Sequence, residues 1–477
     1  MSTSSPPGMN IDNWSAARPP QSDRAGPLTL RDDVFTNSPM YQPGDKRTTD
    51  GLRSERNDGF DNVFRDYRNR ADGQPAATST GPRTLFTFLR YNAGGFYFGT
   101  LSRDDLKSGV GVLSIPKSIF YEGEWLEDSF NGVGLVVRPG KPSYFGEFKN
   151  GAFEGYGRIV AKHHSFLGSF SSGVKSGVGE TITRQGVKVF GNYYKSRLND
   201  YGEISDVSSQ VTLKGWFRGG KLHGKAVKSG PKGKFIARYK NGVREGQGGL
   251  FDAEGKLRMV GTYVNDQLSG FSKFVAEGTS FEGYFSGGHK EGLGRISSKG
   301  QVYLGYFVLG NRQGFGRGAG DGWEYTGNWF KDTFSGTGYL RFTEKHTTYF
   351  GSFKDGVKHG LGVLIEEGRE YYGYFNMGSR EGDAIIKVPG KGERYANFEN
   401  DRLIDIIRTT TPEINKLIDS GRPDFRTFAE ESSRLLKEIS REISSQTQEL
   451  NIDWEDIEKR VDGESEKLNE DYRKILM

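Results

Sequence analysis

The chain has 477 residues, a formal net charge of +5 and no cysteine. The lack of cysteine excludes disulfides, thiol catalysis and cysteine-ligated zinc, and is typical of a reducing compartment. No apolar run approaches the length of a membrane-spanning helix, and no signal peptide is visible. Residue 2 is Ser2 rather than the glycine that N-myristoylation requires, so we expect a cytoplasmic protein without that anchor.

Residues 1–84 are rich in Ser, Pro, Gly, Arg and Asp, and this composition predicts a disordered N-terminal tail. Within the tail, Phe60, Val63, Phe64 and Tyr67 stand at the i, i+3, i+4 and i+7 spacing of one helical face. Two interpretations stay open. The four residues are either a short motif that folds on a partner or aromatic residues scattered in a disordered segment.

A repeated pattern organises the chain from about residue 96 to residue 400. In SYFGEFKNGAFEGYGR, which begins at Ser143, an aromatic-Gly-aromatic triplet precedes an Asn-Gly turn and a second pair of spaced glycines. The first glycine of this unit, replaced twice by alanine, recurs every 22 to 24 residues, which identifies a repeat architecture. These positions are Gly99, Gly123, Gly146, Gly168, Gly191, Gly215, Ala237, Gly261, Gly283, Gly305, Gly327, Gly351, Gly373 and Ala396.

Each unit is predicted to be a β-hairpin. Alternate residues of a strand share a face, so Tyr144, Gly146 and Phe148 point to one side. Asn-Gly is a hairpin turn, and Gly155 and Gly157 share one face of the return strand. Glycine lacks a Cβ, so an aromatic ring can lie flat on its backbone. A single hairpin is too small to be stable and must stack on its neighbours.

Four of these units resemble the MORN repeat family: YFGEFKNGAFEGYG (144–157), YLGYFVLGNRQGFG (303–316), YTGNWFKDTFSGTG (325–338) and YFGSFKDGVKHGLG (349–362). The resemblance implies a mainly β fold, in which residues 85–400 form about 13–14 repeats of an elongated single-sheet hairpin meander. At about 10 Å per repeat, the array would be a rod roughly 130 Å long. Three units depart from the pattern, with Asp200, Ala226 and Ala237 in place of glycine, and we expect the rod to bend or twist there.

The family resemblance also implies a scaffold between membranes and the cytoskeleton, or an adaptor that binds partner peptides along the groove of the array. Most aromatic residues of the repeats are expected in the core, and any exposed ones would bind an extended or helical peptide. The candidate groove residues are Tyr303, Phe307, Tyr325, Trp329, Tyr349, Phe353, Tyr371 and Phe375.

The strongest local signal is a basic stretch in the middle of the array. Residues 207–244 contain no Asp or Glu, and we name their ten cationic side chains the basic band. Its possible partners are anionic phospholipid, the acidic C-terminal helices of the chain itself, or acidic cytoskeletal proteins; a solvated charged surface is the remaining interpretation. Nucleic acid is not expected, because the aromatic residues are used for packing. The band consists of Lys214, Arg218, Lys221, Lys225, Lys228, Lys232, Lys234, Arg238, Lys240 and Arg244.

Residues 411–477 are predicted to be helical. Thr411-Pro412-Glu413 starts a short helix that stops by Gly421, a longer helix covers about 424–450, and a third begins near residue 451 or 453. The third has Trp454, Val461, Leu468 and Ile475 at heptad spacing. From residue 413 onward there are 17 acidic against 11 basic residues. The segment is either a cap on the open edge of the last hairpin or a site of self-association.

No catalytic, cofactor or metal site is predicted. GGKLHGK (219–225) fits a phosphate-loop pattern only formally, because an alanine follows it and it lies in a hairpin. The six histidines are dispersed, so no metal site or catalytic triad is evident. We therefore expect a non-catalytic, peripheral scaffold linking membrane and cytoskeleton, with anionic lipid bound by the basic band. The alternative is a protein-interaction adaptor, for example in a ciliary or flagellar assembly, and homo-oligomers could form through the C-terminal helices.

Overall fold

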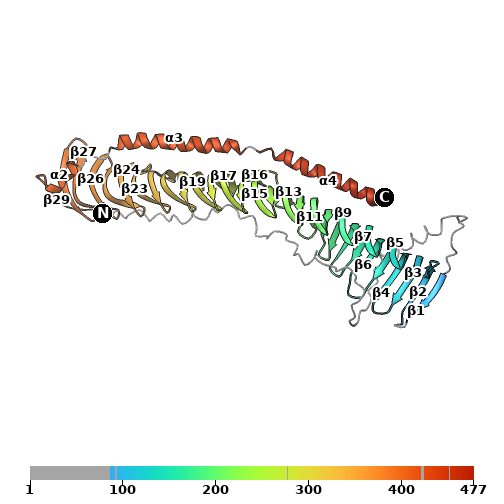
Figure 1. The fold of residues 1–477 in the computed structure, drawn as a ribbon. Helices are drawn as coiled ribbons and strands as arrows, with labels where there is room; N and C mark the ends of the chain where they lie inside the picture. Colours follow the sequence, from blue (N-terminus) through green and yellow to red (C-terminus); the bar gives the residue numbers. More distant parts are fainter. Residues whose placement is uncertain (1–85, 92–93, 277, 420–423, 451, 477) are drawn as a thin grey trace. The chain divides into compact units, whose positions relative to one another are not determined.

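The structure, a computed structural model, describes residues 86–476 except 92–93, 277, 420–423 and 451 (Figure 1). These residues form 29 antiparallel strands followed by three helices, which confirms the predicted mainly β hairpin meander. Contacts divide them into two compact units, each of which is described by itself. The first unit contains residues up to Lys221 together with those from Asp462 onward, and the second contains residues 222–461. The predicted N-terminal tail, with Phe60 to Tyr67, lies outside the described residues.

The first unit contains twelve strands, each paired antiparallel with the next along the chain. They are β1 Phe86–Arg90, β2 Phe96–Leu101, β3 Lys107–Ile115, β4 Ile119–Leu126, β5 Ser129–Val137, β6 Ser143–Lys149, β7 Ala152–Val160, β8 His164–Ser171, β9 Val174–Thr183, β10 Val187–Tyr194, β11 Arg197–Asp206 and β12 Val211–Arg218.

The second unit continues the same pattern with β13–β29, again paired in chain order. These strands are β13 Lys221–Gly230, β14 Gly233–Lys240, β15 Val243–Phe251, β16 Leu257–Val264, β17 Gln267–Ala276, β18 Thr279–Ser286, β19 His289–Ser298, β20 Gln301–Val308, β21 Asn311–Gly320, β22 Trp323–Phe330, β23 Thr333–Phe342, β24 Thr347–Lys354, β25 Val357–Glu366, β26 Arg369–Asn376, β27 Ser379–Val388, β28 Gly392–Glu399 and β29 Arg402–Ile407.

The hairpin β6–β7 shows why the repeat keeps its glycines. Gly146 pairs with Gly157, and a bulge lies between Gly146 and Phe148. The ring of Tyr144 is fully buried, and a Cβ at Gly157 would overlap the atoms of that ring. The same overlap recurs at Gly316 with Tyr303 and at Gly338 with Tyr325. The predicted packing of rings on glycine is therefore confirmed in both units. We call this side of the sheet the aromatic face.

The divergent repeats solve the same problem with other residues. Asp200 has φ +56°, the left-handed conformation that Gly155 (φ +57°) adopts at the equivalent position. Ala226 pairs directly with Ala237, and both side chains are buried. Two buried methyl groups thus stand where other repeats have a pair of glycines. Whether the array bends there stays a prediction, as does its length.

Three described helices follow the strands: α2 (Pro412–Asp419), α3 (Phe425–Glu449) and α4 (Trp454–Leu476). Their bounds agree with the sequence prediction, and Asp424 caps α3 by accepting a hydrogen bond from the Thr427 amide. Residues 454–461 of α4 belong to the second unit and the remainder to the first. Figure 1 shows α3 running across the strands rather than along them.

The helices pack on the side of the sheet opposite the aromatic face, which we call the helix face. In α2, the buried Leu417 packs against Tyr372 and Ile385. In α3, Ile439 and Ile443 pack against Phe271. The sequence prediction of an edge cap placed this segment on the last hairpin, whereas these contacts lie on the face of the sheet. The physical reason is that each helix has an apolar side, which becomes buried when the helix packs on the face of the sheet.

Candidate functional site

The eight aromatic residues proposed for a peptide groove are all in the core of the second unit. Their exposed fractions are between 0 and 4 %. Tyr325, for example, stacks on Phe334 at a centroid distance of 3.9 Å and meets Trp329 and Phe353 edge-on at 5.2 Å. A peptide would reach these rings only after their neighbours moved, so peptide binding on them stays a prediction and packing is the role that the structure describes.

Sequence reasoning missed a set of cations that close the aromatic face. They stand at the second residue of the return strand, where other repeats have Phe or Leu. In the first unit, the Lys175 ammonium lies 4.3 Å from the ring centroid of Phe166. In the second, the Arg312 guanidinium lies 4.2 Å from the ring of Trp329 and forms an ion pair with Asp332 at 2.9 Å. An alignment of the repeats would have shown that this position of the return strand is occupied by Phe, Leu, Lys or Arg.

Burial of these cations changes their acidity. Desolvation lowers the pKa of Lys175 to about 8 and that of Lys290, its counterpart in the second unit, also to about 8. Desolvation likewise lowers the pKa of Arg312, although Asp332 opposes the shift. These side chains are 2 to 8 % exposed. They therefore join adjacent repeats by cation–π contacts and do not present a charged surface to a partner.

The helix face of the second unit combines apolar and polar contacts. Phe350 meets Phe425 and Phe428 of α3 at centroid distances of 5.5 and 5.0 Å. Farther along α3, Tyr284 donates a hydrogen bond to Glu442 (2.8 Å), and Arg295 donates one to Ser440 (2.8 Å). This face therefore binds an amphipathic helix through aromatic anchors with polar contacts beside them.

The structure distributes the basic band over several surfaces. In the first unit Lys214 lies on the helix face, while Arg218 and Lys221 flank an exposed turn. In the second unit Lys225 pairs with Arg238 across β13 and β14. The remaining members are divided between the helix face (Lys234), the aromatic face (Lys228 and Arg244) and exposed turns (Lys232 and Lys240). The band is thus brought together only in part.

Two lysines of the band form ion pairs with α4. In the second unit, Lys234 contacts Glu458 at 2.5 Å. In the first unit, Lys214 contacts Asp462 at 3.0 Å, and nearby Ser465 donates a hydrogen bond to Glu203. Arg244 is paired with Asp266 at 2.9 Å. For the other seven members, no ion pair is present among the residues that the structure describes.

Three heptad residues of α4, Trp454, Val461 and Leu468, are turned toward the protein's own interior rather than toward a second chain. In the second unit, Trp454 packs against Gly249 and meets the Phe251 ring at 6.0 Å, and Val461 is 1 % exposed. In the first unit, Leu468 is 4 % exposed and Tyr472 meets Phe190 at 5.0 Å. Self-association through this seam would require α4 to leave these contacts. It stays a prediction.

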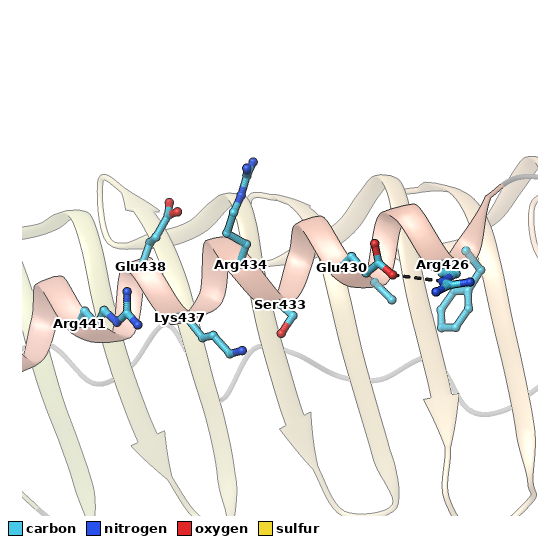
Figure 2. Close-up of a pocket in the computed structure, with 9 residues that line it drawn as sticks. Arg426, Glu430, Ser433, Arg434, Lys437, Glu438 and Arg441 are labelled. Carbon is cyan, nitrogen blue, oxygen red and sulfur yellow. Dashed lines mark hydrogen bonds and ion pairs between the residues drawn. The ribbon is translucent and has the colours of Figure 1, made fainter.

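No catalytic arrangement emerges from the described surface. A hollow of about 810 Å³ is an open depression along α3 (Figure 2). Its labelled side chains carry both signs of charge, with Arg426 and Glu430 paired at 3.1 Å, as on a solvated helix. Within the described residues, no three His, Asp or Glu side chains are placed to hold a metal ion. None of the described helices is long and apolar enough to span a membrane.

Hairpins in chain order, rings packed on paired glycines and one shared aromatic core per unit define a β-hairpin repeat protein. The profile of the MORN repeat family matches residues 121–139, 144–160, 215–235 and 349–365. The chain therefore carries MORN repeats, as the sequence resemblance predicted. Such repeats are consistent with a scaffold or interaction protein and are generally non-enzymatic. No curated protein matches the chain significantly in sequence.

Proposed function

We propose that this protein is a non-catalytic peripheral scaffold of the cytoplasm that links a membrane to the cytoskeleton, and that its basic band binds anionic phospholipid. The observation that supports lipid binding best is the basic band itself, with ten cations and no acidic residue in residues 207–244. Seven of the ten form no ion pair with the described residues, and five of these seven are highly exposed. Cations left in this state attract an anionic surface.

The expected strength of lipid binding follows from the number of cations that act together. Each lysine or arginine near an anionic bilayer contributes about 1 kcal/mol, so about five would contribute roughly 5 kcal/mol. This corresponds to a dissociation constant of about 0.2 mM for one chain. Binding of that strength becomes useful when several chains act on one membrane, and it weakens steeply as salt rises.

The acidic helix α4 competes for part of this surface. Glu458 and Asp462 neutralise Lys234 and Lys214, one pair in each unit. If α4 holds these lysines in solution, removal of the two carboxylates should strengthen lipid binding. The two ion pairs thus favour the predicted interaction of the C-terminal segment with the band, and leave lipid as a partner for the remaining cations.

Sedimentation with phosphoinositide-rich vesicles tests the proposal. The full-length protein should bind at low salt, lose at least tenfold in affinity at physiological salt, and fail to bind when Lys221, Lys225, Lys228, Lys232 and Lys234 are changed to Glu. Glu458→Gln with Asp462→Asn should strengthen binding, whereas the matched pair Glu455→Gln with Glu466→Gln should not. Absence of vesicle binding at low salt by both the full-length protein and the Glu458→Gln/Asp462→Asn variant would contradict the membrane function.

An adaptor for protein partners is the second candidate function. The observation that favours it is the helix face, which already binds three helices of this chain through aromatic anchors such as Phe350 and Tyr372. A scaffold with such a surface can accept a helix or peptide from another protein. Capture of a defined cytoskeletal protein by the full-length chain, without any vesicle binding, would favour the adaptor over the membrane scaffold.

A further inference from the structure

A group of exposed phenylalanine rings lies on the helix face at the start of the first unit. Phe86, Phe88 and Phe98 are 63, 53 and 46 % exposed. Phe86 stacks on Phe98 at 5.8 Å, and Phe88 stacks on Phe96 at 5.6 Å. Val110, on the next strand, is 49 % exposed. We call these five residues the phenylalanine patch. A contiguous apolar surface of this kind marks an interaction site.

The patch occupies the register that helices cover elsewhere. Phe98 stands directly before the repeat glycine Gly99, as Phe190 stands before Gly191 in the same unit. Phe190 is covered by Tyr472 of α4 and is only 9 % exposed. In the second unit, Phe350 has the same place before its glycine and is covered by two phenylalanines of α3. The patch is therefore an open continuation of the helix-binding surface.

We propose that residues 60–67 of the same chain occupy the phenylalanine patch as an amphipathic helix. They lie outside the described residues, and their sequence supplies Phe60, Val63, Phe64 and Tyr67 at the spacing of one helical face. Successive anchors on such a face are about 5–6 Å apart, close to the 4.8 Å between strands. A helix that crosses the strands can therefore place its anchors over neighbouring strands of the patch.

Chain length and charge support this assignment. Eighteen residues separate Tyr67 from Phe86, the first residue of β1, and a chain of that length can span roughly 60 Å. A linker of this length therefore allows the segment to reach the phenylalanine patch on the helix face. Arg68 and Arg70 would flank its apolar stripe, and Glu122 and Glu124 lie on the helix face two strands from Phe98. These two arginines and two glutamates carry opposite charges.

The absence of cysteine makes accessibility a direct test. Val110→Cys in the full-length protein introduces one thiol into the patch, and its rate of reaction with a maleimide reports whether the patch is covered. Adding Phe60→Asp and Phe64→Asp should raise this rate at least tenfold, because charged residues cannot remain on an apolar surface. Phe60→Leu with Phe64→Leu should preserve the slow rate. Tyr194→Cys, at an exposed turn of the same unit, should react at one rate in all three backgrounds.

Two results would overturn the proposal. Equal labelling of Val110→Cys with and without the two aspartates would show that residues 60–67 do not cover the patch. Protection that disappears on dilution would show that the occupant comes from a second copy. Slow labelling that is independent of protein concentration and abolished by the aspartates would support the assignment.

Discussion

The aromatic face and the helix face of this protein are built by different kinds of interaction. The aromatic face repeats one local arrangement, in which a ring such as Tyr144 lies on Gly157 of the same hairpin and touches rings of the next. The helix face has no such repeat. Its partners are α2, α3 and α4, which follow all the strands in the sequence; the hydrogen bond from Tyr284 to Glu442 joins residues that are 158 positions apart.

This difference assigns stability and interaction to opposite sides of one sheet. Rings packed on glycine backbone leave no room for a partner, and the aromatic face therefore holds the repeats together. The helix face is chemically mixed, with apolar, cationic and acidic side chains in adjacent repeats. A surface of that kind accepts a helix whose pattern matches it, so differences between repeats on this face determine which helix lies where.

The largest effect is expected on the aromatic face. Tyr325→Ala removes a fully buried ring and should lower the free energy of unfolding by about 3–5 kcal/mol. Tyr374→Ala, which truncates a ring that is 40 % exposed, is the matched control and should cost far less. Chemical denaturation of the two variants measures the difference. A nearly neutral Tyr325→Ala would mean that this ring is available for binding.

A somewhat smaller and more local effect is expected on the helix face. Ile443→Ala removes a buried anchor of α3 and should weaken its docking by about 2–4 kcal/mol, while the strands stay folded. Hydrogen exchange should then accelerate in α3 and remain slow in β22 and β23. Leu435→Ala, at a position of α3 that is 37 % exposed, serves as the control. Equal acceleration throughout the second unit would show that the two faces are not energetically separable.

The buried cations sharpen the comparison through pH. Because burial lowers the pKa of Lys290 from 10.5 to about 8, the unfolded chain binds more protons than the folded chain between these values. The free energy of unfolding should therefore rise with pH from about 8 to 10, by roughly 3 kcal/mol at most for this group. Lys290→Met should flatten this rise, and the exposed Lys345→Met should leave it unchanged. Melting curves at several pH values test the sign.

The smallest effect is expected for the ion pair between the second unit and its part of α4. Lys234 and Glu458 have side chains that are 28 and 32 % exposed, and partly exposed pairs contribute at most about 1 kcal/mol. A double-mutant cycle with Lys234→Met and Glu458→Gln should give a coupling in that range, and smaller at high salt. A coupling of zero at low salt would mean that α4 is held by Trp454 and its other apolar residues alone.

The sequence predicts the aromatic face well, because the contacts of Tyr144, Gly146 and Gly157 recur within one repeat and leave a period. It also predicts the bounds of α2, α3 and α4 from Pro412, Asp424 and the apolar stripes. It does not predict where those helices lie, because the matching residues on the strands, such as Phe271 and Phe350, have no period that distinguishes them from solvent-facing positions. The burial of Lys175 and Arg312 was not predicted, because charged residues are expected outside a core.

The central claim is that α4 contacts the basic band on the helix face, and this contact can be tested directly in solution. Lys234→Cys and Glu458→Cys place the only two thiols of the chain at positions whose native side chains are in contact. A short bismaleimide should join them within one chain rapidly and at high dilution, whereas Lys240→Cys with Glu458→Cys, which moves one thiol to an exposed turn, should react slowly. Equal rates for the two pairs, or cross-links that form only between chains, would contradict the assignment of the helix face as the surface that binds α4.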